Sequence, residues 1–267
     1  MNRISVADTL REAIALTIAH RRDLLRVGLV FIIGFFALGV VFIHYLLPMF
    51  PSAMMEGDAT AAQPLVDPRL PSAVLIMFVI EVLLLTVFAV GWHRAVLIGP
   101  ERGQGVQLGG RELRYFGRFW LCIVLCLAVV FFIAFVEQFI GLAAHADPQS
   151  MMWGAELANS LVAAYVFSRL GPSFAALSVD MAMNFRQSWN VTKGSGLRIL
   201  VTYVLATAGG LALNIAIGML LNLLGLGEFA PYTVMLVGAL TFCALVALTV
   251  SINAIVFRRL TGWKAPA

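Results

Sequence analysis

The chain has 267 residues, of which 61% are hydrophobic and only 12% charged, and its mean hydropathy is +0.94. This balance excludes an ordinary soluble globular domain and is typical of an integral membrane protein. A formal charge of +4 could suggest a nucleic-acid partner, but the cations gather at the edges of apolar runs, where membrane topology and anionic lipid already explain them. We therefore expect no nucleic-acid partner.

Six apolar runs recur along the chain, and each is long enough to cross a hydrocarbon core of about 30 Å at about 1.5 Å per helical residue. They follow an amphipathic N-terminal segment, 5–26, and occupy residues 27–47, 72–92, 118–140, 155–178, 199–223 and 232–256. The polar connections between them are too short to bury a separate soluble core. The sequence therefore predicts one integral membrane domain over residues 1–267, an all-α polytopic protein with six transmembrane helices.

The positive charges alternate along the connections between these runs. Most of the 18 lysines and arginines fall in the N-terminal segment, the second and fourth connections and the C-terminal segment, whereas the other connections are mostly acidic. Cytoplasmic loops of membrane proteins carry an excess of positive charge. Both termini are therefore predicted to face the cytoplasm.

Two amphipathic stretches precede odd-numbered spans and resemble each other. They are LREAIALTIAHRRDLLRV from Leu10 and FRQSWNVTKGSGLRILV from Phe185, and each has a threonine seven residues after its start, Thr17 and Thr192. Both predict short interfacial helices on the cytoplasmic side. One interpretation is a repeated unit of interfacial helix and helical hairpin, and the other is chance similarity between amphipathic segments.

A single carboxylate, Glu81, lies near the middle of the second span, in the run MFVIEVLLLTVFAVGWHR (77–94). An ionised side chain there costs about 2.5–3.5 kcal/mol, so it must be protonated, paired or hydrated. Arg169 in the fourth span is the only basic residue predicted at comparable depth, and we predict an ion pair between them. The alternative is a site for a proton, a cation or a polar substrate, which a lone carboxylate would leave incomplete. His93 and Arg94, beside Trp92 at the inner boundary, are predicted to be interfacial anchors.

The fourth span contains an internal proline, Pro172, directly after Gly171. Proline removes a helical hydrogen bond and clashes with the preceding turn. We expect this pair either to kink the span or to end its first half.

Small and partly polar residues recur every four positions along the fifth span. They are Thr202, Ala206, Gly210, Asn214, Gly218 and Asn222. Such a face lets a neighbouring helix approach closely, and the sixth span offers Ala239, Cys243, Ala247 and Ser251 at the same spacing. We predict that these two faces pack together, and the alternative is a polar pathway lined by Asn214 and Asn222.

No motif for catalysis, metal binding or phosphate binding is present in the sequence. The glycine-rich stretch GPERGQGVQLGG (99–110) lacks the Lys-Ser or Lys-Thr of a phosphate loop. The four histidines are scattered without metal-ligand spacing, and the cysteines, Cys122, Cys126 and Cys243, fall inside predicted spans as small apolar residues. We expect no metal, no cofactor and no enzymatic activity.

Three segments carry a resemblance to known proteins: GWHRAVLIG (91–99), YVFSRLGPSFAALSVD (165–180) and FRQSWNVTKGSGLRIL (185–200). They resemble inner-leaflet signatures of uncharacterised bacterial membrane proteins similar to the YciC family and to the membrane domain of some glycerophosphodiester phosphodiesterases. The resemblance implies a six-helix, multi-pass protein of the bacterial cytoplasmic (inner) membrane. It brings no catalytic or binding residue.

The function predicted from these features is that of a scaffold or accessory subunit. Such a protein would bind lipids of the bilayer or other membrane proteins through its helix faces. The alternative is a small transporter or channel with a polar site around Glu81 and Arg169. The sequence does not determine the oligomeric state.

Overall fold

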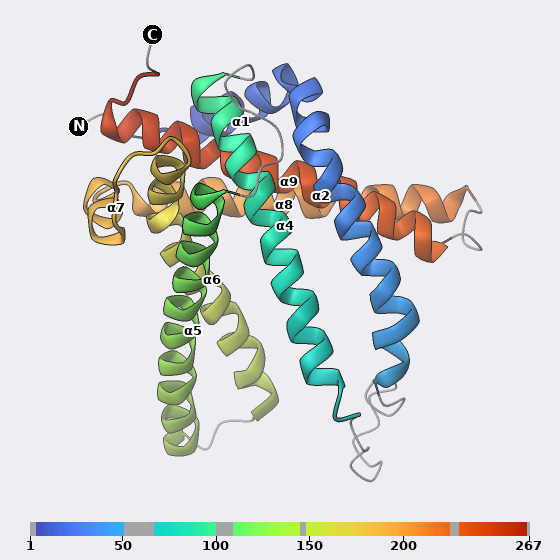
Figure 1. Ribbon diagram of the computed structural model, residues 1–267. Helices are drawn as coiled ribbons and strands as arrows, with labels where there is room; N and C mark the ends of the chain where they lie inside the picture. The colour runs from blue at the N-terminus through green and yellow to red at the C-terminus, as the bar shows by residue number, and fades with distance from the viewer. Residues whose placement is uncertain (1–3, 51–66, 100–108, 145–147, 225–229, 266–267) are drawn as a thin grey trace.

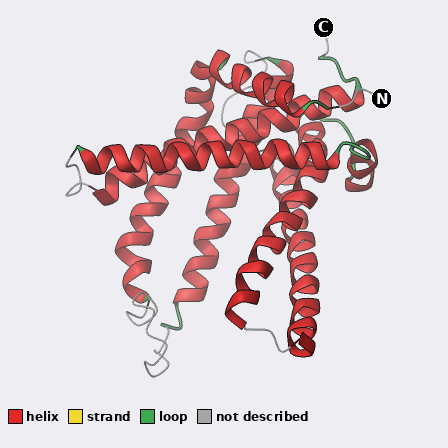
Figure 2. Cartoon of the chain, turned by 180° about the vertical axis from the view of Figure 1, so that it is seen from behind, coloured by secondary structure: helices red, strands yellow, loops and turns green. Residues whose placement is uncertain are grey.

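The computed structural model describes residues 4–50, 67–99, 109–144, 148–224 and 230–265, and every regular element in these ranges is helical (Figures 1 and 2). The helices are α1 (Val6–Ala19), α2 (Arg21–Val41), α4 (Leu70–Ile98), α5 (Gly110–Ala144), α6 (Pro148–Ser178), α7 (Phe185–Val191), α8 (Gly196–Leu223) and α9 (Ala230–Thr261). A π-helical turn η1 (Phe42–Leu46) and a 3-10 turn η2 (Leu47–Met49) extend α2. The all-α prediction is confirmed.

Six of these helices are long and apolar enough to cross a membrane, which confirms a multi-pass membrane protein. Each contains one predicted span but extends beyond it, so that α4 continues to Ile98 and α5 begins at Gly110. The added turns carry arginines, whose long side chains can reach polar surroundings from an apolar helix. Residues 100–108 of the glycine-rich connection lie outside the described residues, and the orientation across the membrane stays a prediction.

The six long helices form three hairpins, α2–α4, α5–α6 and α8–α9. The second helix of each hairpin is central, because α4, α6 and α9 pack against one another. The first helix of each hairpin lies outside and contacts two central helices, its own partner and that of the preceding hairpin. Thus α2 packs on α4 and α9, α5 on α6 and α4, and α8 on α9 and α6. The hairpins are therefore arranged in a closed cycle of three.

The two short helices follow the same rule as the outer helices. α1 packs against α9, and α7 packs against α6, in each case the central helix of the preceding hairpin. The threonines that the sequence comparison aligned also correspond: Thr17 Oγ1 lies 3.4 Å from Ser251 Oγ of α9, and Thr192 Oγ1 lies 3.5 Å from the carbonyl oxygen of Arg169 in α6. This correspondence supports the repeated unit over chance similarity.

Local capping explains where the short helices begin. At α7, Asn184 accepts from the backbone N–H of Gln187 at 2.8 Å, and the Gln187 side chain accepts from the backbone N–H of Asn184 at the same distance. This reciprocal pair satisfies donors that a helix start leaves free. A seven-residue helix is too short to be stable alone, so its position depends on this cap and on packing against α6.

The third hairpin runs steeply across the other two. In Figure 1, α8 and α9 extend across the view while α2, α4, α5 and α6 run down it, and the adjoining ends of α8 and α9 project beyond α2. Most side chains of α8 after Ala206 are exposed. Exposed apolar side chains lie on every side of this stretch rather than on one face, which indicates a helix surrounded by lipid or protein rather than one lying at the water interface.

The core lies where the central helices cross. It is close to the end of the hairpins that carries α1, α7 and five arginines, Arg94, Arg111, Arg114, Arg258 and Arg259. We call this the basic end. Trp92 is 0% exposed, and its Nε1 donates to the Ala247 carbonyl at 2.9 Å and to Ser251 Oγ at 3.0 Å. His93 is also fully buried. The prediction that His93 is an interfacial anchor is therefore wrong, because His93 is enclosed in the core, where its ring lies 6.1 Å from that of Tyr115 in α5.

α6 continues through Pro172 as one helix to Ser178. Of the two expected outcomes, an end of the helix at Pro172 is excluded. The following residues stay helical although proline removes one hydrogen bond, because both Gly171 and Pro172 are buried among the central helices, where packing outweighs the local preference.

Candidate functional site

Arg169 does not pair with Glu81. Its guanidinium donates from Nη1 to the Thr192 carbonyl at 2.9 Å and from Nη2 to the Trp189 carbonyl at 2.6 Å, and it lies 4.5 Å from the centre of the Trp189 ring. These carbonyls belong to the C-terminal end of α7, where the helix dipole attracts a cation. The predicted ion pair is wrong because α7 folds back onto α6 and supplies carbonyl acceptors for Arg169. The predicted spans did not include α7.

The contact between α6 and α7 is reciprocal. The carbonyl oxygen of Arg169 accepts a hydrogen bond from Ser188 Oγ at 2.8 Å, and both Ser188 and Thr192 are fully buried. The sequence analysis did not single out Ser188. Ser188 is a polar residue on the inner face of a short amphipathic helix. Serines in such positions are too common for the sequence alone to mark this one as a contact.

Glu81 is half-buried in α4, and among the described residues no ion pair includes it. Arg169 therefore contributes nothing to a polar site at Glu81. The carboxylate remains an isolated polar group at the middle of an apolar helix.

The small-residue face of α8 packs on α9 over only part of its length. Thr202 and Ala206 are buried, and a Cβ at Gly210 would lie 3.1 Å from Leu245 Cδ1. Asn214 Nδ2 donates to Thr241 Oγ1 at 2.9 Å. Beyond that point the face is open: a Cβ at Gly218 would meet no described atom within 4 Å, and the sixth member of the predicted face, Asn222, is exposed.

The partner face on α9 differs from the predicted one. Ala239, Cys243, Ala247 and Ser251 are turned toward α2 and α4 rather than α8. A Cβ at Gly28 of α2 would lie 2.9 Å from Cys243 Sγ, so these small residues allow close approach on that side. The predicted pairing of the two small faces is thus wrong, because the central helix α9 has neighbours on several sides and uses its smallest side chains against α2 and α4.

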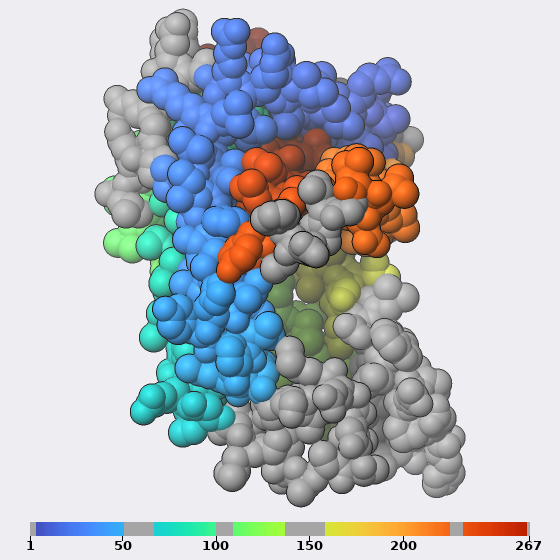
Figure 3. All heavy atoms as spheres, turned by 90° about the vertical axis from the view of Figure 1, so that its right-hand side faces the viewer, coloured from blue at the N-terminus to red at the C-terminus, as the bar shows by residue number. Residues whose placement is uncertain are grey.

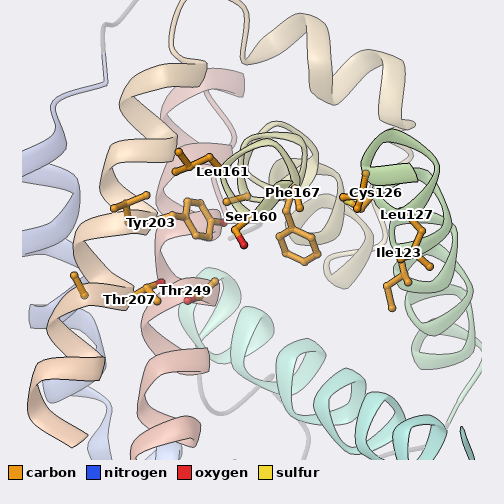
Figure 4. Close-up of a pocket in the computed structure, with 14 residues that line it drawn as sticks. Ile123, Cys126, Leu127, Ser160, Leu161, Phe167, Tyr203, Thr207 and Thr249 are labelled. Carbon is orange, nitrogen blue, oxygen red and sulfur yellow. The ribbon is translucent and has the colours of Figure 1, made fainter. Parts of the chain in front are cut away.

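An apolar groove of about 740 Å³ lies between the second and third hairpins (Figure 4). In Figure 4 the side chains of Ile123 and Cys126 on α5 lie on one side, Tyr203 and Thr207 on α8 on the other, and Phe167 of α6 between them. None of the residues that line it is charged. Seen from the side to which α8 and α9 project, the surface recedes beneath their ends toward α5 and α6 (Figure 3).

The groove is the candidate functional site, because it is concave, lies between membrane-spanning helices and is lined by apolar and hydroxyl-bearing side chains. The hydroxyl of Tyr203, one of its polar groups, is engaged with the protein and donates to Asn253 Oδ1 of α9. Such a site suits an apolar ligand or helix. It has neither a nucleophile next to a base nor a set of carboxylates.

Among the described residues, no group of three or more histidines, cysteines, aspartates or glutamates is placed to hold a metal ion. His93 lies alone in the core, with Nδ1 2.9 Å from the Ala89 carbonyl and Nε2 without a hydrogen-bond partner. A single buried imidazole cannot form a structural metal site, which needs several converging ligands.

No family model, no curated protein and no solved structure matches the chain. The resemblance to the YciC family and to the phosphodiesterase membrane domain therefore stays a prediction.

Proposed function

We propose that the protein is a membrane scaffold or accessory subunit that holds a transmembrane helix of another membrane protein in the groove between α5–α6 and α8–α9. The observation that carries the proposal is the apolar lining of this groove, which contains no charged residue. A transport pathway for a polar substrate would need polar groups along it. A helix-binding surface needs apolar contact and small side chains.

The dimensions of the groove fit about two turns of a helix. The lining residues of α5 run from Ile123 to Val130, about 10 Å at 1.5 Å per residue. Two turns of a helix about 10 Å across occupy roughly 850 Å³, close to the 740 Å³ of the groove. Ser160 and Ala164 of α6 are four residues apart on its wall, the spacing that allows close helix approach.

The transporter alternative depended on Glu81 and Arg169 acting together. Neither residue lines the groove, and Arg169 is bound to α7. Without its basic partner, Glu81 offers one carboxylate and no second group to complete a relay. The accessory function is therefore the better supported of the two.

A native thiol in the groove provides the test. Cys126 is partly exposed, whereas Cys122 and Cys243 are buried, so a thiol-directed photo-crosslinker on the protein in its native membrane should attach at Cys126. We expect a covalent adduct with a specific membrane protein. Replacing Ala164 with leucine fills the groove and should reduce the adduct at least about tenfold, since a helix can no longer approach closely.

The matched control moves the thiol to another part of α5. In a Cys126→Ser background, Phe132→Cys places the crosslinker at a position that is 67% exposed outside the groove. Equal capture of the same protein from both positions, capture that survives Ala164→Leu, or adducts with lipid alone would each overturn the proposed helix partner. Thermal unfolding of each variant checks that the fold is kept.

A further inference from the structure

Three guanidinium groups converge on one carboxylate at the basic end, where α4, α5 and α6 meet. Arg111 of α5 donates to Asp180 from Nη2 at 2.6 Å and from Nε at 3.0 Å. Arg114 Nη2 of the same helix lies 3.6 Å from the Asp180 carboxylate, and Arg94 Nη1 of α4 lies 3.9 Å from it. We call these four residues the arginine cluster.

Asp180 occupies a backbone position that usually holds glycine. Its φ is 58°, and it directly follows the last turn of α6, where the N–H of Met181 bonds to the Ala176 carbonyl at 2.9 Å. This is the hydrogen-bond pattern that ends a helix with a left-handed residue, which costs free energy for a residue with a side chain. An aspartate at this position indicates that its carboxylate has a role beyond ending the helix.

The carboxylate of Asp180 is held in its charged form. The hydrogen bond from Arg111 lowers the pKa of Asp180, partial burial opposes this, and the charges of Arg111, Arg94 and Arg114 lower the pKa further. Because the folded pKa is below the unfolded value, the ion pairs stabilise the fold above the ordinary aspartate pKa and lose that contribution as the pH falls through the lowered one. The cluster is therefore fully charged at neutral pH.

The cations nevertheless exceed the anions here. Glu112 is buried next to the cluster and accepts from the N–H of Gly109 at 2.9 Å, while Arg118, one turn further along α5, bonds to the carbonyls of Ser173 and Met183. Among the described residues here, four arginines and two carboxylates leave a net charge of +2. The Arg114 side chain is 66% exposed and that of Asp180 48% exposed, so an anion can reach them from outside.

We propose that the arginine cluster binds a phosphate group, carried by an anionic phospholipid in the adjacent leaflet, and that Asp180 competes with the phosphate for the arginines. Guanidinium groups bind phosphate oxygens with paired hydrogen bonds, as they bind carboxylates. The cluster lies at the ends of membrane-spanning helices, the level of lipid headgroups. The proposal does not depend on the groove or on its occupant.

The test compares binding of labelled phosphatidylglycerol by the full chain in phosphatidylcholine nanodiscs. Arg111→Gln together with Arg114→Gln should weaken phosphatidylglycerol binding about tenfold or more, since glutamine lacks both the charge and the paired donors with which a guanidinium group binds phosphate. The matched control is Arg21→Gln with Arg22→Gln, two exposed arginines at the start of α2. The control should change binding about twofold or less, and equal losses in both double variants would overturn the site.

Substitution of the carboxylate separates binding from structural pairing. Asparagine tolerates the left-handed backbone, so Asp180→Asn keeps the turn while removing the competing charge. We expect phosphatidylglycerol binding to tighten several-fold in this variant. If Asp180→Asn instead weakens binding as much as the double arginine variant does, the arginines serve only the ion pairs and the proposal fails.

Inorganic phosphate distinguishes the two sources of the ligand. If the lipid headgroup is the ligand, millimolar phosphate at constant ionic strength should leave phosphatidylglycerol bound. Displacement of the lipid by phosphate, with direct phosphate binding lost in the double variant, would overturn the lipid source and identify a soluble phosphate ligand. Thermal unfolding in phosphatidylcholine reports folding of each variant, and if Arg111→Gln does not fold, the exposed Arg114→Gln alone carries the comparison.

Discussion

Gly171→Ala is expected to destabilise the protein by about 1–3 kcal/mol, as overpacking does in a close-packed core. A Cβ at Gly171 would overlap Asn253 Oδ1 of α9 and lie 2.8 Å from its Cγ and 3.2 Å from Tyr203 Oη of α8. Asn253 cannot easily move away, because it is buried and accepts from Tyr203. Denaturant unfolding followed by circular dichroism in detergent micelles measures the loss.

The control for this prediction is the same substitution where there is room. Gly209 lies in the interior of α8, and a Cβ there would meet no described atom within 4 Å. Gly209→Ala should therefore be neutral or stabilise the protein by up to about 1 kcal/mol, the difference in helix propensity. Because the chemical change is identical, equal effects at Gly171 and Gly209 would contradict the view that α6, α8 and α9 meet closely at Gly171.

The sequence predicted the helices well because membrane spans are a local property. A run of apolar residues specifies a span regardless of which neighbour it meets, so all six spans coincide with long helices. The predicted ends of these helices were less accurate. Arg111 and Arg114 precede the predicted third span, which begins at residue 118, but they lie inside α5, where both contact the carboxylate of Asp180 just beyond α6.

Contacts between helices were predictable only where they follow from the spacing of small residues within one helix. The periodicity of α8 correctly marks residues that can approach another helix, yet it does not say which helix or over what length. Asn214 contacts α9, whereas Gly218 is open. Which face of α9 is used depends on the closed cycle of hairpins, a long-range arrangement that no single segment encodes.

The repeated unit of interfacial helix and hairpin is the feature of the sequence from which the cycle of hairpins could have been predicted. Thr17 and Thr192 were aligned by sequence, and each proves to face the central helix of the preceding hairpin. Had the repeat been assumed, α7 would have been placed on α6, and Arg169 would have been given a partner outside its span. The error over the Glu81–Arg169 pair arose from treating depth within a span as the only guide to proximity.

Arg169→Met is expected to destabilise the protein by about 3 kcal/mol, because it removes two hydrogen bonds from a charged group, each of which contributes about 1.5–3 kcal/mol. Arg169 is 5% exposed and donates to the carbonyls of Trp189 and Thr192. Hydrogen exchange should show the loss first in α7, since this seven-residue helix has little stability of its own.

Two further variants make this prediction specific. Arg186 lies on α7 but is exposed, so Arg186→Met removes an equal charge from the same helix and should change stability by about 0.5 kcal/mol or less. Trp189→Ala removes the stacked ring but keeps the carbonyl acceptors, and should cost less than Arg169→Met. If Arg169→Met leaves exchange in α7 unchanged, the guanidinium does not hold α7 against α6, and the Ser188 contact with the Arg169 carbonyl must suffice.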